Sequence, residues 1–199
     1  MIGTLPMVAL APLDYRYALD AARTLFAPHA APLIRCNVAE LDAEVRQRFA
    51  RESTSIGHGA LWIEPLADSW RAELKNLAEQ LPAGAPLVVI ASQPLGRMVP
   101  ERRSWSGAPL GMQLTGIYVL LRALRSAGLK IEARHGIHTA ASIALSQASQ
   151  QAARLGRPDL GDRLHFAARL RYCTHGPLAA LATVGLVVGI QQTKEQMNK

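Results

Sequence analysis

Cationic side chains and one indole gather in a single segment of the sequence, Gln93 to Gly111. Arg97, Arg102 and Arg103 carry the charge, and Trp105 supplies the aromatic ring. Guanidinium groups bind carboxylates and phosphates in a bidentate manner, and an indole can stack on a planar group. These residues therefore predict a contact surface for an anionic substrate or partner. A loop that folds back on the protein surface is the alternative reading of the same residues.

The position of this segment supports the contact hypothesis. It directly follows the apolar run Pro86–Ala91, which we expect to be a central strand of a sheet. Open α/β sheets bind ligands beyond the carboxyl ends of their strands. A connection of about 20 residues is also longer than most loops that only join two elements.

Other residue types with catalytic potential form no recognisable motif. The sequence has no nucleophile elbow G-x-S-x-G, no P-loop and no H-E-x-x-H. Four histidines without a paired carboxylate are general-base candidates or ordinary half-buried residues. They are His135, His138, His165 and His175. We assign no catalytic residue from the sequence.

The two cysteines, Cys36 and Cys173, lack the spacing of a metal site or a disulfide framework. We therefore expect no metal and a reducing, cytoplasmic location. The longest apolar run, residues 176–190, is shorter than the roughly 20 residues of a membrane span. We interpret it as a buried strand with its lead-in, and we expect no membrane contact.

Positive charge is concentrated in the second half of the chain. Residues 1–96 contain 8 Lys/Arg and 10 Asp/Glu, whereas residues 97–171 contain 12 Lys/Arg and 4 Asp/Glu. The formal net charge of the chain is +7. A basic half of this kind is either a solvated face or a surface for a polyanion such as nucleic acid.

Short apolar runs alternate with amphipathic helical patterns, as in an α/β domain with a mainly parallel sheet. The predicted strands are Pro6–Ala11, Pro32–Cys36, Ala60–Ile63, Pro86–Ala91, Leu129–His135 and Ala182–Ile190. The first predicted helix begins near Asp14, which we expect to be its N-cap. The other predicted helices cover 41–50, 68–81, 112–127, 139–155 and 163–172. We expect the first four strands to be parallel and the last one antiparallel beside them.

The chain is predicted to be one α/β domain, 1–199, with a helical insertion at about 139–177. A stripe of mostly small residues recurs in this insertion at helical spacing, at Ala141, Leu145, Ala148 and Ala152. Such a stripe permits close helix packing, either within the chain or between copies. A homo-oligomer or a complementing subunit is therefore an expected partner.

Several stretches resemble the class I S-adenosylmethionine-dependent methyltransferases from the second strand of that fold onward. The resemblance to strand two lies in VALAPLDYRYALDAARTLF, to strand three in PLIRCNVAEL and to strand five in WRAELKNLAEQLPAGAPLVVIA. The resemblance to strand six lies in MQLTGIYVLLRALRSAGLKIEARHG and to strand seven in ATVGLVVGI. These stretches include the flanking helices and turns. The resemblance implies a three-layer, Rossmann-like sheet, mostly parallel with an antiparallel last strand. It also implies S-adenosylmethionine as cofactor.

The glycine-rich turn that follows the first strand of this family has no counterpart here. No G-x-G-x-G can be formed from the 15 glycines, so the sequence resembles a fold that is truncated at its N-terminus and lacks the first strand and this motif. Asp14 and Asn37 fall near the positions that bind the ribose and the adenine in the family. Their alternative roles are a helix N-cap for Asp14 and a turn residue for Asn37.

Two functions follow from these observations. In the first, the protein is methyltransferase-like and either degenerate or one part of a split enzyme, and the isolated chain binds S-adenosylmethionine weakly or not at all. In the second, it is a non-enzymatic protein that binds nucleic acid or another polyanion with its basic second half. The salt dependence of binding would separate them.

Overall fold

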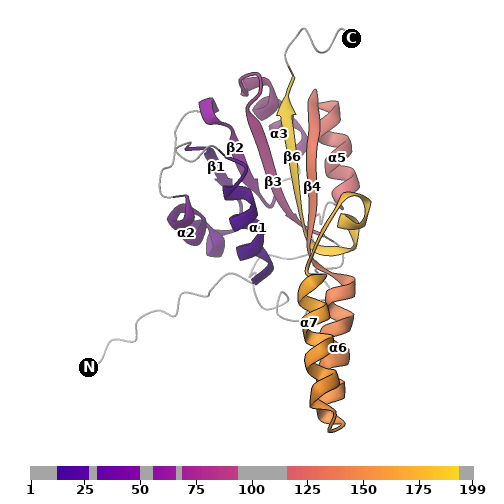
Figure 1. Cartoon of the computed structure of the whole chain (residues 1–199). Helices are drawn as coiled ribbons and strands as arrows, with labels where there is room; N and C mark the ends of the chain where they lie inside the picture. Colours follow the sequence, from indigo (N-terminus) through magenta and orange to yellow (C-terminus); the bar gives the residue numbers. More distant parts are fainter. Residues whose placement is uncertain (1–12, 27–30, 50–55, 66–68, 94–115, 193–199) are drawn as a thin grey trace, which may run out of the picture.

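A computed structural model describes residues 13–26, 31–49, 56–65, 69–93 and 116–192 of the chain (Figure 1). The strands are β1 (Leu33–Cys36), β2 (Ala60–Ile63), β3 (Pro86–Ser92), β4 (Leu129–Thr139), β5 (Cys173–His175) and β6 (Ala182–Gln191). The α-helices are α1 (Leu13–Arg23), α2 (Ala39–Arg48), α3 (Trp70–Gln80), α5 (Ile117–Ser126), α6 (Ala140–Arg154) and α7 (Pro158–Leu170). Two short 3-10 helices are η1 (Ile56–His58) and η3 (Gly176–Leu181).

The strands form one sheet in the order β1-β2-β3-β6-β4-β5. β1, β2 and β3 are parallel neighbours, and β6 is antiparallel to both β3 and β4. β5 is antiparallel to β4. The expected parallel strands at 32–36, 60–63 and 86–91 and the antiparallel last strand are thus confirmed. The strand expected at Pro6–Ala11 lies outside the described residues.

Helices cover both faces of the sheet, which gives three layers (Figure 1). α1 and α2 pack on one face, where Tyr15 and Leu19 of α1 contact the core around Val88. α3 and α5 pack on the other face, where Trp70 meets the core around Val89. Successive strand residues point to opposite faces, so β2 and β3 supply both cores from one run of apolar residues.

The longest apolar run of the sequence forms β6. Eight successive residues from Ala182 to Gly189 are buried, because β6 lies between β3 and β4 with a helical layer on each face. The interpretation of this run as a buried strand is confirmed. None of the described helices is long and apolar enough to span a membrane.

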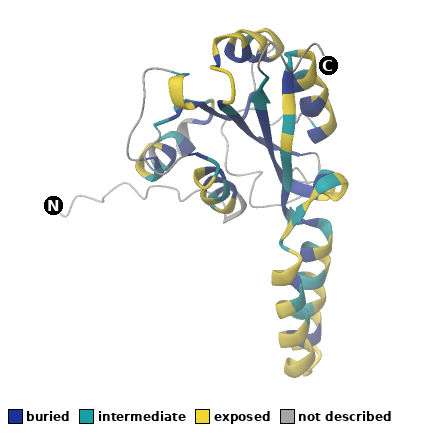
Figure 2. Ribbon diagram, turned by 45° about the horizontal axis from the view of Figure 1, so that its top comes forward, coloured by how far each residue is buried: buried dark blue, intermediate teal, exposed yellow. Residues whose placement is uncertain are grey.

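Between β4 and β5, α6 and α7 form a hairpin that projects away from the sheet (Figure 1). Most of its surface is exposed (Figure 2). The helices approach closely because small residues line their contact, with Ala152, Gly161 and Ala168 buried. A methyl group on Gly161 would lie 3.2 Å from the Ser149 carbonyl oxygen, so a larger residue would push the helices apart.

Several element boundaries differ from those predicted. α7 begins at Pro158 rather than at Arg163, because proline is well suited to the first turn of a helix. α1 begins at Leu13, so Asp14 lies inside its first turn and not before it. β4 continues to Thr139, beyond its predicted end at His135, and β5 pairs with residues 135–137.

One strand has a neighbour that the family resemblance did not predict. β1 lies in the stretch that resembles the third strand of the family, and β2 lies between that stretch and the one that resembles the fifth strand. β1 pairs directly with β2, whereas the third and fourth strands are not adjacent in a doubly wound sheet of order 3-2-1-4-5. β1 therefore occupies the position of the first strand in such a sheet, and the assignment to the third strand is wrong. Strand pairing is a non-local property, so the local apolar pattern could not reveal it.

Candidate functional site

The carboxyl ends of β1, β2, β3 and β4 lie at one edge of the sheet, since these four strands run in the same direction. The α6–α7 hairpin starts at the same edge (Figure 1). Thr139 joins both ends of the hairpin there. Its Oγ1 accepts a hydrogen bond from the Ser142 amide (3.1 Å) and donates one to the Arg171 carbonyl (2.5 Å). This edge is where an open α/β sheet binds its ligand.

A buried polar cluster occupies the edge between β2 and β3. Glu64 follows β2 directly, is only 4% exposed, and accepts hydrogen bonds from the Ser92 amide (2.5 Å) and the Ser92 hydroxyl (2.8 Å). The Tyr15 hydroxyl of α1 also donates to Glu64, and it lies 2.6 Å from Ser92 Oγ. Sequence reasoning missed this cluster, because its three members come from segments far apart in the chain.

The backbone at Glu64 has an unusual conformation. Its φ is +51°, in the left-handed region that residues other than glycine seldom adopt, and it precedes Pro65. Backbone strain of this kind is concentrated at functional sites and must be supported by surrounding contacts. The hydrogen bonds to Tyr15 and Ser92 provide that support. A charged residue directly before Pro65 at the end of a strand is the sequence signal that could have indicated this site.

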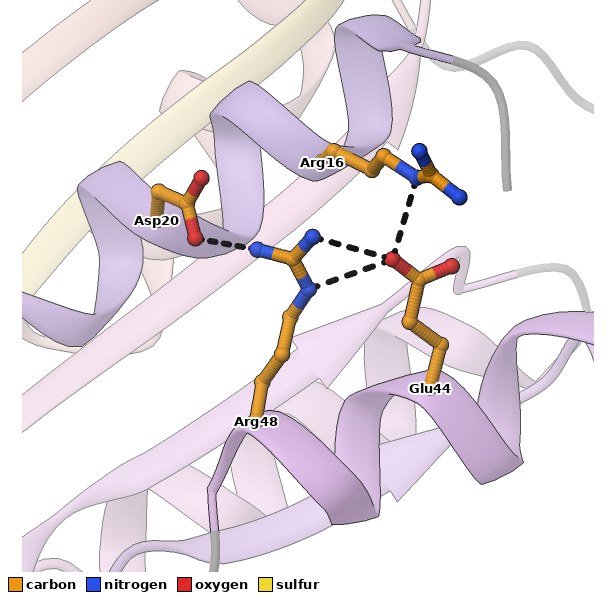
Figure 3. Close-up of polar contacts among 4 residues, drawn as sticks. All are labelled: Arg16, Asp20, Glu44 and Arg48. Carbon is orange, nitrogen blue, oxygen red and sulfur yellow. Dashed lines mark hydrogen bonds and ion pairs between the residues drawn. The ribbon is translucent and has the colours of Figure 1, made fainter. Parts of the chain in front are cut away.

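Ion pairs hold α1, which carries Tyr15, against α2 (Figure 3). Glu44 of α2 pairs with Arg16 of α1 at 3.2 Å and with Arg48 at 3.0 Å. Arg48 also pairs with Asp20 of α1. The network joins residues on both helices, so it fixes the helix from which Tyr15 reaches Glu64.

The end of β1 carries two residues of interest. Asn37, which was predicted to contact a cofactor, has an exposed side chain. Its backbone N–H donates to the Ile63 carbonyl (3.2 Å) and so continues the hydrogen bonding between β1 and β2. Burial raises the pKa of the Cys36 thiol to about 11, with further contributions from Asp42 and Glu64. Cys36 is thus a neutral thiol near pH 7 and a poor nucleophile. Asp14 lies on α1, one residue before Tyr15.

The segment Gln93 to Gly111 is only described at its first residue. Gln93 is 1% exposed, and its amide group donates to the Ala179 carbonyl of η3 (2.6 Å) and accepts from the Ile117 amide of α5 (3.4 Å). Gln93 is therefore a structural clasp between β3, α5 and η3 and not part of an exposed contact surface. Arg97, Arg102, Arg103 and Trp105 lie outside the described residues, and their contact role stays a prediction.

The histidines do not converge on one site. His135 of β4 and His175 of β5 face each other across the two strands, with ring centroids 4.6 Å apart. Burial and the neighbouring His175 lower the pKa of His135. His138 instead stacks on Tyr172 (5.1 Å), and His165 is exposed on α7.

Comparison with known proteins identifies the fold. Neither the family models nor the curated proteins give a sequence match. Among solved structures, a Thermotoga maritima protein described as an S-adenosylmethionine-dependent methyltransferase, possible histamine N-methyltransferase, matches 89% of both chains with 14% identity and a TM-score of 0.53.

Two further solved structures match with lower TM-scores. An N-methyltransferase from Haemonchus contortus matches 92% of this chain and 54% of its own, at 7% identity and a TM-score of 0.41. A mycolic acid cyclopropane synthase matches 87% of this chain and 82% of its own, at 10% identity and a TM-score of 0.42. The strand order, the antiparallel β6 and the first similarity together show that this chain has the class I S-adenosylmethionine-dependent methyltransferase-like fold.

Proposed function

We propose that this chain is a degenerate relative of the methyltransferases that does not bind S-adenosylmethionine tightly by itself. The observation that carries the proposal is the internal engagement of Glu64. Its carboxylate is buried and already accepts hydrogen bonds from Tyr15 and Ser92 at the edge where a cofactor would lie. A ligand hydroxyl would have to displace these bonds and would gain little in exchange.

The end of β1 supports the same conclusion. The sequence has no glycine between Gly3 and Gly57, so every residue after β1 and through α2 carries a side chain. Glycine permits the close backbone approach that a glycine-rich turn offers to a cofactor. Val38 is buried at the start of α2 and occupies the place where such a turn would be. The described residues therefore do not fit the cofactor.

Titration calorimetry of the purified chain with S-adenosylmethionine tests the proposal. We expect no saturation at cofactor concentrations of tens of micromolar, with the melting temperature unchanged by the cofactor. If weak binding persists, Asp14 and Asn37 are the residues that we predict to support it, and Asn37→Ala should abolish it. A low-micromolar dissociation constant would refute the proposal.

A split enzyme is the second candidate, and the position of β1 favours it. Within the described sheet β1 is an edge strand, so its outer side is open to pairing with a strand of a partner subunit. A partner strand at this edge, with the loop that follows it, would supply cofactor contacts that the end of β1 lacks. If the enzyme is split, we expect S-adenosylmethionine to bind only to a complex of this chain with its partner isolated from native cells. A complex of defined stoichiometry that does not bind S-adenosylmethionine would contradict the split enzyme and favour the degenerate protein.

A further inference from the structure

The outer surface of the α3–α5 layer carries a group of cations with few counter-charges among the described residues. A groove of about 460 Å³ between the two helices is lined by Arg71 and Lys75 of α3 and by Arg122 of α5. None of the described residues that line it is acidic. Three like charges facing one groove repel each other, and an anion in the groove would remove that repulsion.

The internal contacts of these cations are weak. Lys75 lies 3.9 Å from Glu79, but both side chains are more than 60% exposed, and such pairs contribute little. Arg71 rests over the Trp70 ring at 4.6 Å, and it forms no ion pair with the described residues. Arg122 is exposed and takes part in no ion pair with the described residues.

An exposed aromatic ring completes the groove. Tyr118 of α5 lines it and is 56% exposed, so its ring is accessible to a ligand in the groove. Its hydroxyl donates to the Pro177 carbonyl of η3 (3.2 Å), so the ring is held in place rather than free to turn. A fixed ring next to cations is the arrangement that stacks on a nucleobase while the cations bind its phosphates.

The basic surface continues on the other side of α5. A second groove, of about 430 Å³, is lined by Arg125 of α5, Arg134 and His135 of β4, and His175 of β5. Among the described residues that line it, Glu132 is the one acid. Arg122 and Arg125 are three residues apart on one helix, so they are surface neighbours and join the two grooves. The cations thus form a track longer than one nucleotide would need.

We propose that this α5 surface, defined by Arg71, Lys75, Tyr118, Arg122, Arg125 and Arg134, binds single-stranded nucleic acid. The phosphates lie along the arginines and Lys75, and one base stacks on Tyr118. This binding is independent of the cofactor site, so it stands whether or not the chain binds S-adenosylmethionine.

Fluorescence anisotropy with a labelled oligouridylate of about 20 nucleotides tests the proposal. We expect Arg71→Gln, Lys75→Gln and Arg122→Gln together to weaken binding by about tenfold or more and to reduce the slope of log Kd against log salt by about 2. The matched control removes three exposed arginines of the hairpin, as Arg154→Gln, Arg163→Gln and Arg169→Gln. Equal losses in both triple variants would show attraction by net charge alone and would overturn the proposal.

Tyr118 gives a second test that charge does not affect. Tyr118→Ala should weaken binding roughly five- to 100-fold, whereas Tyr118→Phe should bind as the wild type does, because it keeps the ring. Heparin, which has charge but no bases, should bind Tyr118→Ala and the wild type equally. A duplex bound more tightly than the single strand, or an oligonucleotide affinity that ignores Tyr118→Ala, would refute base stacking at this surface. The melting temperature of each variant confirms that it is folded.

Discussion

The arginines of the first half and those of the second half have different surroundings. Arg16, Arg35, Arg46 and Arg48, on α1, β1 and α2, all form ion pairs with carboxylates. Arg122, Arg125, Arg134, Arg163 and Arg169, on α5, β4 and α7, form none with the described residues. The same residue type therefore serves packing on one side of the molecule and stays available to a partner on the other.

Both the composition and the fold contribute to this difference between the two halves. Carboxylates outnumber cations in residues 1–96, and α1 and α2 lie side by side, so Arg16 and Arg48 each meet an acid of the neighbouring helix (Figure 3). In the second half, the described acids Glu132, Asp159 and Asp162 are too few to neutralise the cations. Variants that remove internal partners should therefore lose stability, and variants of the unpaired cations should not.

The largest loss is expected for Glu64→Ala. It removes the buried acceptor of the Tyr15 hydroxyl and of the Ser92 amide and hydroxyl, and unsatisfied buried donors cost about 1–3 kcal/mol each. We expect the free energy of unfolding, measured with urea, to fall by about 3 kcal/mol. Glu64→Gln keeps an acceptor of the same size and should lose less. Unchanged stability in Glu64→Ala would show that the cluster is strained for function and does not stabilise the fold.

A smaller loss is expected for Arg48→Ala, which removes the ion pairs of Arg48 with Asp20 of α1 and with Glu44 of α2. Partly exposed pairs contribute up to about 1 kcal/mol, and this loss should shrink in high salt. Arg163→Ala, an unpaired arginine on α7, is the control and should stay within about 0.5 kcal/mol of the wild type. Equal losses in the two variants would remove the distinction between the halves. A double-mutant cycle of Arg48 and Glu44 isolates the pair.

The smallest effect concerns pH. Burial and the nearby His175 lower the pKa of His135 below its ordinary value of 6.5. The unfolded state therefore binds the proton more readily, so this contribution to stability is present above pH 6.5 and is lost as the pH falls through the lower folded pKa. His135→Gln should show a weaker decline of the melting temperature between pH 7 and pH 5 than the wild type shows. An identical pH profile in the two proteins would contradict the assigned cause.

Local patterns were sufficient to predict most elements. The strand Ala60–Ile63 was predicted with its observed bounds, because a run of four apolar residues between polar turns is compatible with few other secondary structures. The helix expected at 68–81 is observed as Trp70–Gln80, since its apolar residues recur at helical spacing. β5 was missed because three residues carry no periodic signal, and its pairing with β4 is what makes it a strand.

The candidate site was less accessible to prediction. Asn37 was correctly placed at the end of a strand, yet it is exposed, and the buried residues at this edge are Glu64, Ser92 and Tyr15. Gln93 was placed in a contact loop but is a buried clasp. Each of these outcomes depends on contacts between residues that are more than 20 positions apart, which no local pattern encodes.

The sequence by itself determined the class of the fold, the unequal charge of the two halves and the lack of a glycine-rich turn, because each is a property of composition or of local spacing. The tertiary structure alone decided that β1 pairs with β2, that Tyr15 and Ser92 enclose Glu64, and that three cations face one groove beside Tyr118. The physical reason is that hydrogen bonds and charge interactions act over a few ångströms in space, whatever the separation of the residues along the chain.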